Sequence, residues 1–316
     1  MLSVCKSDNN TLQKLPDDSI EKGSWINLIK PSGDELRLVA EQTGAPMDLL
    51  KAALDAEERS RIEIEEDSIL VITNIPIMEG ETSFDTLPLG IVITPNHFIT
   101  ICLKDNRVMS YFDKDNTRFF CTAKKARFLF QIQYRSAILY LRYLKYINQQ
   151  TDEIELNIRR TMKNKALFQL LQLEKSLVYF TTALKDNGIV LQKLMRLRNN
   201  RNIQHLLDFD EEDEDLMEDV IIENKQAIEM VEMHSNILSS MMNAFASIIS
   251  NNLNFVMKFL TTMTILLAVP TMLASFWGMN VTLPWSATPW GFLYVIIFSA
   301  LITGFTAYIL WKKGMF

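Results

Sequence analysis

The stretch NFVMKFLTTMTILLAVPTMLASFWGMN, residues 254–280, decides the fold. Its residues 259–277 form 19 consecutive positions without a charged side chain, close to the roughly 20 apolar residues that an α-helix needs to cross a bilayer core. A second uncharged run of 22 residues, 290–311, is closed by Lys312 and Lys313. The sequence therefore predicts a hairpin of two membrane-spanning helices at the end of the chain.

One face of the first predicted span is unlike that of a simple lipid anchor. Alternating steps of three and four residues keep to one face of a helix, and here they pass almost entirely through small or neutral polar side chains. We call this set the polar stripe; its members are Asn236, Ser240, Asn243, Ser247, Ser250, Asn254, Met257, Thr261, Thr264, Ala268, Thr271, Ser275 and Gly278. The flanking positions carry Phe, Leu, Ile, Val and Met, so the stripe is expected to meet water or other copies of itself.

Two interpretations of the polar stripe are open. Small residues let membrane helices pack closely, so the stripe could be a packing face only. Alternatively, several copies turn it inward and line a pore with hydroxyl and amide groups. No Asp or Glu follows Glu232, so the last 84 residues contain no carboxylate. Because Mg²⁺ gives up its water reluctantly, such a pore would pass hydrated ions, driven by a membrane potential worth about 2.3 kcal/mol per charge per 100 mV.

The residues that follow the first span carry a resemblance to a known family. Gly278-Met279-Asn280 comes directly after this span and is preceded by Ser275-Phe276-Trp277. In this place the motif resembles the signature of the CorA family of divalent-cation channels, and residues 254–261 resemble the entry of that family into the membrane. The resemblance implies a homopentamer in the cell (inner/plasma) membrane, with both termini in the cytoplasm. It also implies a cytoplasmic domain that senses Mg²⁺, the ion being both substrate and regulatory ligand.

In the channel interpretation, Gly278, Met279 and Asn280 form a selectivity filter. A ring of Asn280 carbonyl groups would accept hydrogen bonds from the water shell of the metal ion. Gly278 is expected to leave the helix in a conformation open to glycine, and Met279 to hold the turn against its neighbours. The alternative for Asn280 is a left-handed helix cap. The predicted pore-lining residues are Asn254, Met257, Leu260, Thr261, Thr264, Ala268, Thr271 and Ser275, of which Met257 and Leu260 match apolar gate positions of the family.

The first part of the chain has the pattern of an α/β domain. Residues 1–22 are polar and are expected to be irregular. A strand from Trp25 precedes two helices, separated by a break at residues 44–46, and the second helix is expected to end with residues 54–61. Two β-branched stretches, 69–78 and 87–103, predict strands with turns at Gly80 and Pro95-Asn96. The helices should pack on the sheet.

Long helices are predicted for the rest of the soluble part. Three glycine-free segments, 124–148, 151–186 and 189–206, are separated by Thr151 as a helix start and by Gly188 as a stop. From Glu211 no Gly or Pro occurs until Pro270. A single helix from there to Trp277 would be about 100 Å long at about 1.5 Å per residue, so it must project as a stalk.

The predicted fold is a cytoplasmic α/β domain with αβα layers, a long stalk helix and a two-helix C-terminal transmembrane hairpin, predominantly α-helical overall. The expected segments are the N-terminal cytoplasmic α/β domain at 1–123, a cytoplasmic helical region at 124–210, the stalk helix at 211–277 continuing into the first transmembrane helix at about 255–277, an extracytoplasmic loop with the filter motif at 278–289, the second transmembrane helix at 290–311 and a basic cytoplasmic tail at 312–316. The outer loop, 281–289, carries no charge, whereas the family often has an acidic one.

An acidic run lies where the stalk helix begins. Residues 208–219, DFDEEDEDLMED, contain nine carboxylates in 12 positions. They either favour the start of a helix or collect divalent ions. Counted back from Gly278 into the family pattern, Asp219 falls where the resemblance implies an acidic residue of a regulatory Mg²⁺ site, with Glu218 and Glu223 as alternatives. Asp55 is its predicted partner on the N-terminal domain.

Composition excludes several classes of function. The soluble part has 29 Lys and Arg against 38 Asp and Glu, which does not suggest nucleic acid. Phosphate-cradling and dinucleotide motifs are absent from the sequence, so we predict neither an enzyme nor an organic cofactor. The cysteines and histidines are isolated along the sequence, so we predict neither a metal site nor a disulfide. The unpaired cysteines suit a reducing cytosol, and the histidines are expected on surfaces or interfaces. They are Cys5, Cys102, Cys121, His97, His205 and His234.

The predicted function is a homopentameric Mg²⁺ channel in the bilayer, driven by the membrane potential and gated by intracellular Mg²⁺. Lys258, Lys312 and Lys313 place both flanks of the hairpin in the cytoplasm by the positive-inside bias, and no signal peptide precedes the soluble part. One alternative is a Co²⁺, Ni²⁺ or Zn²⁺ transporter of the same fold. The other is a membrane-tethered scaffold or sensor, in which the polar stripe serves packing only.

Overall fold

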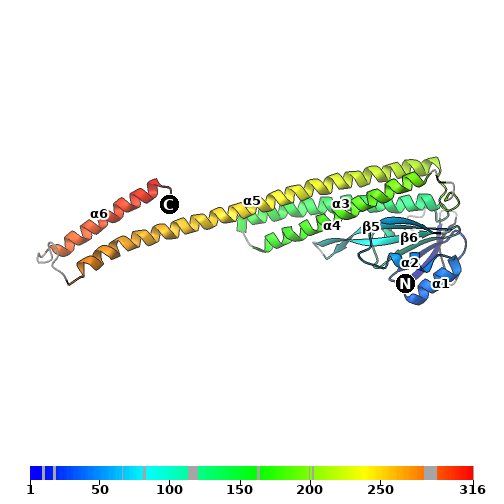
Figure 1. Ribbon diagram of the computed structural model, residues 1–316, viewed down its shortest axis with the longest axis horizontal. Coiled ribbons are helices and arrows are strands. Elements are labelled where there is room, and N and C mark those ends of the chain that lie inside the picture. Colours follow the sequence, from blue (N-terminus) through cyan, green and yellow to red (C-terminus); the bar gives the residue numbers. More distant parts are fainter. Residues whose placement is uncertain are drawn as a thin grey trace. The chain divides into compact units, whose positions relative to one another are not determined.

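The structure is a computed structural model that describes residues 1–8, 11–16, 19–65, 67–80, 83–112, 120–161, 164–198, 200, 203–280 and 290–315. It divides into two compact units, Met1–Ser240 and Met241–Phe316. The N-terminal unit holds a β-sheet with helices on both faces, and the C-terminal unit holds the end of one long helix and a further helix (Figure 1).

The described residues of the N-terminal unit form a seven-stranded sheet in the order β2-β1-β3-β7-β6-β5-β4. Its neighbouring strands run antiparallel except for β3 and β7, which are parallel. The strands are β1 (Leu2–Asp8), β2 (Thr11–Leu15), β3 (Trp25–Ile29), β4 (Arg61–Glu65), β5 (Ser68–Glu79), β6 (Ser83–Ile93) and β7 (Phe98–Cys102). The long β5–β6 hairpin pairs Ile69 with Ile93 and ends at the predicted turn near Gly80.

Two short helices, α1 (Gly33–Thr43) and α2 (Met47–Ala52), cover one face of the sheet (Figure 1). Helix α1 begins with a capping box, in which the Glu35 main-chain N–H donates to Ser32 Oγ and the Ser32 main-chain N–H donates to the Glu35 carboxylate. It ends at Gly44, whose φ of 73° suits glycine. The predicted helix pair and its break are therefore confirmed. The two helices and the sheet share one buried core. The helices contribute Leu36, Val39, Leu49 and Leu50, and the strands contribute Ile26, Leu28, Leu70 and Ile72.

The opposite face of the sheet is covered by α3 (Lys125–Thr161) and α4 (Asn164–Leu197) (Figure 1). Aromatic side chains fill this interface. The ring of Phe128 lies 5.2 Å from Trp25 and 4.7 Å from Phe98, and Phe180 lies 6.2 Å from Phe84, measured between ring centroids. Edge-to-face and tilted rings pack densely in protein cores. The layers are therefore αβα, as predicted.

A buried amide joins α4 to the sheet. Asn187 on α4 donates to the main-chain oxygen of Asn74 across 2.8 Å and accepts from its main-chain N–H across 2.9 Å. Tyr140 on α3 donates to the same oxygen at 2.9 Å. Since both main-chain groups of a buried strand residue are satisfied in this way, these two helices are fixed in register against β5.

Two expectations for the N-terminal part are wrong. Residues 1–22 are not irregular, because Leu2 and Val4 are buried and β1 pairs with β3. Apolar and polar residues alternate in β1, but the alternation is short and most residues around it are polar, so the sequence did not indicate a strand. The second helix ends at Ala52 and does not extend to residue 61. Residues from Arg61 instead form β4, whose Ile62 is buried beside β5.

The predicted division of residues 124–206 into three helices is also wrong, because α3 and α4 run through both expected breaks. Thr151 does not cap a helix; its hydroxyl donates to the Ile147 carbonyl, one turn earlier in α3, across 2.9 Å. Gly188 does not stop α4. A Cβ atom at Gly188 would lie 3.3 Å from Nδ2 of Asn224, so this glycine allows α5 to approach closely.

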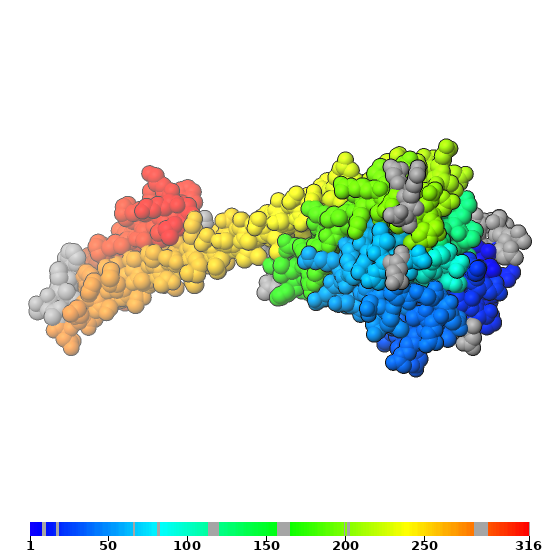
Figure 2. Space-filling view, turned by 45° about the vertical axis from the view of Figure 1, so that its right-hand side comes forward, coloured from blue at the N-terminus to red at the C-terminus, as the bar shows by residue number. Residues whose placement is uncertain are grey.

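Helix α5 (Glu211–Trp277) is continuous over 67 residues and contains Pro270, as predicted. Its first part, to Ser240, belongs to the N-terminal unit, and the remainder forms the C-terminal unit with α6 (Gly291–Lys312). Both α5 and α6 contain a segment long and apolar enough to cross a membrane. The two helices of the C-terminal unit lie side by side, drawn in orange and red in Figure 2.

Candidate functional site

Two opposite faces of α5 can be distinguished in the C-terminal unit. The face toward α6 contains Thr262, which is fully buried, and Leu266, Pro270 and Ala274, which line an apolar groove shared with α6. At 3.6 residues per turn, the polar stripe lies on the other side of the helix. Its members in this segment are all exposed: Thr261, Thr264, Ala268, Thr271 and Ser275. Helix α6 therefore leaves the stripe uncovered.

The hydroxyl groups of the polar stripe are oriented by the helix itself. Thr264 donates to the Leu260 carbonyl and Thr271 to the Leu267 carbonyl, both across 2.8 Å. A hydroxyl whose proton is used in this way still has lone pairs to accept hydrogen bonds. Because water molecules bound to a cation point their protons outward, the stripe presents acceptors suited to a hydrated cation.

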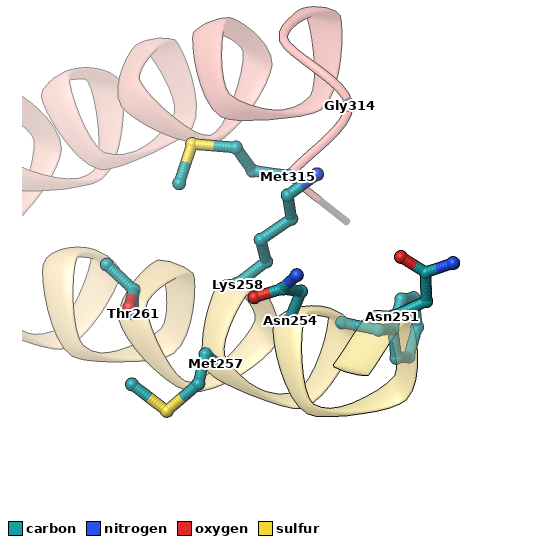
Figure 3. A pocket seen from close by; sticks show the side chains of 8 residues that line it. Asn251, Asn254, Met257, Lys258, Thr261, Gly314 and Met315 are labelled. Carbon is teal, nitrogen blue, oxygen red and sulfur yellow. The ribbon is translucent and has the colours of Figure 1, made fainter. Parts of the chain in front are cut away.

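A pocket of about 500 Å³ lies at the N-terminal end of this segment (Figure 3). Figure 3 shows the side chains of Asn254 and Lys258 directed toward the end of α6, whereas Met257 points to the other side. The sequence had assigned Lys258 only to membrane orientation. Lys258 lies one helical turn after the predicted pore residue Asn254 and lines the same pocket. The lining residues are Asn251, Asn254, Phe255, Met257, Lys258, Thr261, Gly314 and Met315.

The predicted filter motif follows the last turn of α5. The main-chain N–H of Gly278 donates to the carbonyls of Ala274 and Ser275, at 3.0 and 3.2 Å. Among the described residues, positive φ angles occur at four other glycines and at Lys30. Two expectations are therefore wrong: Gly278 does not adopt a conformation reserved for glycine, and Asn280 is not a left-handed helix cap.

The surroundings of the motif are open within one chain. A Cβ atom at Gly278 would lie 3.5 Å from the Ala274 carbonyl oxygen, an ordinary contact distance. The side chain of Met279 is 55% exposed in the single chain, so its expected contact with neighbours stays a prediction for the assembled protein. The uncharged outer loop, residues 281–289, lies outside the described residues. Among the described residues, no contact within the chain requires glycine at position 278.

Four of the nine acids in the run at the start of α5, Asp210, Glu212, Asp213 and Glu214, are engaged in hydrogen bonds or ion pairs. The main-chain N–H of Asp213 donates to Asp210 Oδ1 across 2.8 Å, and this bond, together with Lys124, lowers the pKa of Asp210. Burial raises the pKa of Asp213. Further ion pairs join Glu214 to Arg198 at 2.6 Å, Asp210 to Lys124 at 3.2 Å, and Glu212 to Arg127. These contacts favour the interpretation as a helix start.

The two predicted regulatory acids, Asp219 and Asp55, do not belong to a metal-binding cluster formed by the described residues. Asp219 is exposed on α5, and Asp55 is exposed after α2, where it accepts from the Glu57 main-chain N–H at 3.0 Å. Among the described residues, no group of three or more His, Cys, Asp and Glu side chains could hold a metal ion. A site formed by Asp55 and Asp219 would therefore need ligands from another copy.

The histidines were expected on surfaces or interfaces, and two of them are buried instead. His97 lies with Nδ1 3.4 Å from Ser24 Oγ, and burial together with Lys125 and Lys22 lowers its pKa. Burial also lowers the pKa of His234. Both histidines are buried by packing between elements that are distant in sequence, which spacing along the chain does not reveal. His205 is paired with Asp67 at 3.3 Å.

A continuous helix joins the αβα unit to a second helix able to span a membrane, and its polar face is left uncovered by that helix. These features define a two-span membrane protein with a large N-terminal domain. The sequence profile described as CorA-like Mg²⁺ transporter protein matches residues 21–313. The chain belongs to the CorA family, as the filter motif predicted.

Individual relatives cover nearly the whole chain. The cobalt/magnesium transport protein CorA of Methanocaldococcus jannaschii is 28% identical over 99% of this chain and 98% of its own length. The magnesium transport protein CorA of Helicobacter pylori strain 26695 is 23% identical over 92% of this chain and 90% of its own. The complete structure of the M. jannaschii CorA magnesium transporter superposes with a TM-score of 0.84, at 26% identity, covering 98% of this chain and 96% of the other. These proteins are named as transporters, which agrees with the prediction that the chain is not an enzyme.

Proposed function

We propose that several copies of this chain form a pore for Mg²⁺, lined by the polar stripe of α5. The observation that carries the proposal is the exposure of Thr261, Thr264 and Thr271 on the face of α5 opposite α6. A polar face is costly toward lipid, whereas around a shared axis it would meet water. The relatives are named as magnesium or cobalt/magnesium transport proteins, and these names support Mg²⁺ as the substrate.

The ion passes with its water shell in this proposal. The stripe has hydroxyl and amide acceptors, and no carboxylate follows Glu232 in the sequence. Neutral acceptors bind the waters of Mg²⁺ without replacing them, so the ion is not trapped. A divalent ion gains roughly twice the 2.3 kcal/mol per 100 mV of a single charge, which is sufficient driving force without a coupled enzyme.

The filter in this proposal is a ring of Gly278, Met279 and Asn280 at the end of α5. Asn280 supplies side-chain carbonyls to the water shell. Gly278 is needed because neighbouring copies approach here, since its own chain leaves room for a Cβ atom. Farther along, Asn254 and the apolar rings of Met257 and Leu260 form the other end of the path, where a narrow apolar ring can close by losing water.

Assembly and gating follow the pattern of the family resemblance. The proposed assembly is a homopentamer in the cell membrane with both termini in the cytoplasm, an orientation that Lys258, Lys312 and Lys313 favour. Intracellular Mg²⁺ would bind between acidic faces of adjacent copies, with Asp219 and Asp55 as ligands. Loss of Mg²⁺ would leave these carboxylates to repel one another, and this repulsion would loosen the stalks.

Cobalt is the second candidate substrate, because the M. jannaschii relative is named a cobalt/magnesium transport protein. The neutral acceptors of the stripe contact water and not the metal, so they have little means to distinguish two hydrated divalent ions of similar charge. Competition between Co²⁺ and Mg²⁺ for entry would decide which ion is preferred.

The test is Mg²⁺ entry into proteoliposomes that contain a Mg²⁺-sensitive dye, under an inside-negative potential. The wild-type chain is compared with Asn280→Ala and with the control Asn148→Ala on α3. We expect entry for the wild type and the control, and loss of entry for Asn280→Ala with the oligomer intact by size exclusion. Absence of entry for the wild type with Mg²⁺, and also with Co²⁺, would support a membrane-tethered scaffold instead.

A further inference from the structure

A second polar site lies in the N-terminal unit. A pocket of about 70 Å³ is formed between the segment after β7 and the outer face of α3. Three of its lining side chains are arginines, in a chain with a formal net charge of −6. The lining residues are Arg107, Tyr111, Arg135, Ile138, Leu139 and Arg142. Three positive charges gathered in one pocket of an acidic chain could bind an anion.

Helix α3 and the preceding segment both contribute to this arrangement. Arg135 and Arg142 are seven residues apart on α3, which places them on one face of the helix two turns apart. Arg107 comes from the segment between β7 and the short helix η1 (Met109–Tyr111). The guanidinium carbon of Arg135 lies 3.4 Å from the centroid of the Tyr111 ring. This cation–π contact holds Arg135 in place without neutralising its charge.

The three guanidinium groups are not neutralised by the described residues. None of them forms an ion pair with a described Asp or Glu, whereas other cations of the same unit do, such as Lys104 with Glu79 at 2.6 Å and Lys185 with Glu232 at 2.6 Å. The nearest acid in sequence, Asp105, accepts from the Asn106 main-chain N–H at 2.9 Å.

The charges of Arg107 and Arg142 reach the same neighbour. Burial raises the pKa of Tyr143, while the positive charges of Arg107 and Arg142 oppose this increase. Both groups therefore act on one phenol oxygen beside the pocket. Arg107 and Arg142 are exposed and Arg135 is half-buried, so an anion has access to all three guanidinium groups, and its charge would offset their mutual repulsion.

We propose that Arg107, Arg135 and Arg142 bind a phosphate group, supplied as inorganic phosphate or as the terminal phosphate of a nucleoside polyphosphate. The planar guanidinium presents paired N–H donors that match the oxygens of phosphate. The pocket exceeds the roughly 30 Å³ that one water occupies in the liquid, so it admits a small oxyanion. A divalent cation is excluded by the charge of the three arginines.

The test uses the full chain in detergent micelles, with chelator present to remove Mg²⁺ and with constant ionic strength. Isothermal titration measures the binding of inorganic phosphate and, separately, of ATP. The variant Arg142→Gln removes one exposed donor and no buried contact. The control Arg37→Gln removes the same charge from α1, on the other face of the sheet. Circular dichroism compares the thermal unfolding of the variants.

We expect saturable binding of at least one probe, weakened at least about tenfold by Arg142→Gln, since the variant loses charged hydrogen bonds to the phosphate oxygens. Arg37→Gln should bind like the wild type. Binding of both probes would identify phosphate itself as the ligand, and binding of ATP alone a nucleoside polyphosphate. The proposal is overturned if neither probe binds, or if Arg37→Gln weakens binding as much as Arg142→Gln. Transport plays no part in this readout.

Discussion

The hydroxyl of Thr262 on α5 donates a hydrogen bond to the main-chain oxygen of Met315, just beyond the end of α6, across 3.2 Å. Thr262 is fully buried, so this contact defines which side of α5 meets α6. The neighbouring residue Thr261 belongs to the polar stripe and is exposed. One hydrogen bond at the end of the hairpin thus fixes the rotation of α5 that leaves the stripe open.

Replacing Gly278 by Ala should separate assembly from the single chain. The added Cβ atom finds ordinary contact distances within its own chain, 3.5 Å from the Ala274 carbonyl oxygen. We therefore expect unchanged helicity and thermal unfolding but a loss of Mg²⁺ entry of at least about tenfold, because overpacking between copies costs roughly 1–3 kcal/mol. Proteoliposome flux and circular dichroism check this. Gly304→Ala on α6, where a Cβ atom meets open space, is the control. Wild-type flux in Gly278→Ala would refute a close approach of copies there.

Replacing Gly188 by Ala should destabilise the N-terminal unit. The new Cβ atom would lie 3.3 Å from Nδ2 of Asn224, which is buried and donates to the Leu184 carbonyl at 3.1 Å. Moving Asn224 would leave its buried amide without that hydrogen bond, which costs about 1–3 kcal/mol. This cost opposes the roughly 1 kcal/mol that alanine gains in helix propensity, and we expect the cost to be the larger of the two. Thermal unfolding of the full chain should show a lower Tm.

The double variant Gly188→Ala with Asn224→Ala is the control for this prediction. Without the Asn224 amide the clash disappears, so Gly188→Ala should then be neutral or stabilising relative to Asn224→Ala. Equal effects of Gly188→Ala in both backgrounds would show that the close approach to Asn224 is not the cause.

His97 should make the N-terminal unit sensitive to acid. Burial, with Lys125 and Lys22, lowers its pKa in the folded chain below the usual value of about 6.5. Protonation therefore favours the unfolded state: stability is complete above about pH 6.5 and is lost as the pH falls toward the lower folded pKa. Replacing His97 by Gln should flatten this part of the stability curve.

The control for the acid effect is His205→Gln, since His205 is half exposed and paired with Asp67. Thermal unfolding is measured from pH 7.5 to pH 5 for both variants, about one unit or more on either side of the ordinary histidine pKa. The slope should persist in His205→Gln. If His97→Gln retains the wild-type slope as well, the titrating group is another one, with buried His234 the next candidate.

Replacing Asp219 by Lys should reduce the inhibition of entry by internal Mg²⁺. The residue is exposed on α5, so the substitution leaves the fold intact, while it removes a proposed ligand and adds a like charge to the cation. Flux is measured in proteoliposomes loaded with increasing Mg²⁺. Asp215→Lys, one turn earlier and also exposed, is the matched control. The same dependence on internal Mg²⁺ in Asp219→Lys and the wild type would remove Asp219 from the regulatory site.

Local sequence signals predicted the parts of the fold that depend on one element at a time. The two spans followed from uncharged runs, and the end of α1 from the break at residues 44–46. The polar stripe followed from its period, but the face that α6 covers did not. That face depends on Thr262 meeting Met315, 53 residues away.

Long-range pairing decided the segments that were predicted wrongly. Leu2 and Val4 become a strand because β3 and β2 lie on either side of them. Gly188 is a close-packing residue within α4 and not a helix stop, because Asn224, on another helix, occupies the space that a side chain would need. The φ angle of Gly278 is not positive, so the sequence around this glycine did not predict its conformation. Sequence patterns specify such residues only together with their distant partners.

Cysteine accessibility along α5 tests the central claim, that the polar stripe lines a water-filled path, most directly. In a chain with Cys5, Cys102 and Cys121 replaced by Ser, single cysteines are placed at Thr271 and at Leu273. Thr271 lies on the stripe and Leu273 on the side toward α6. A charged, membrane-impermeant thiol reagent is applied during Mg²⁺ entry. The account predicts rapid block for the cysteine at 271 and none for the one at 273. Unimpaired entry through a chain fully labelled at 271, or no labelling at 271 while entry proceeds, would contradict it.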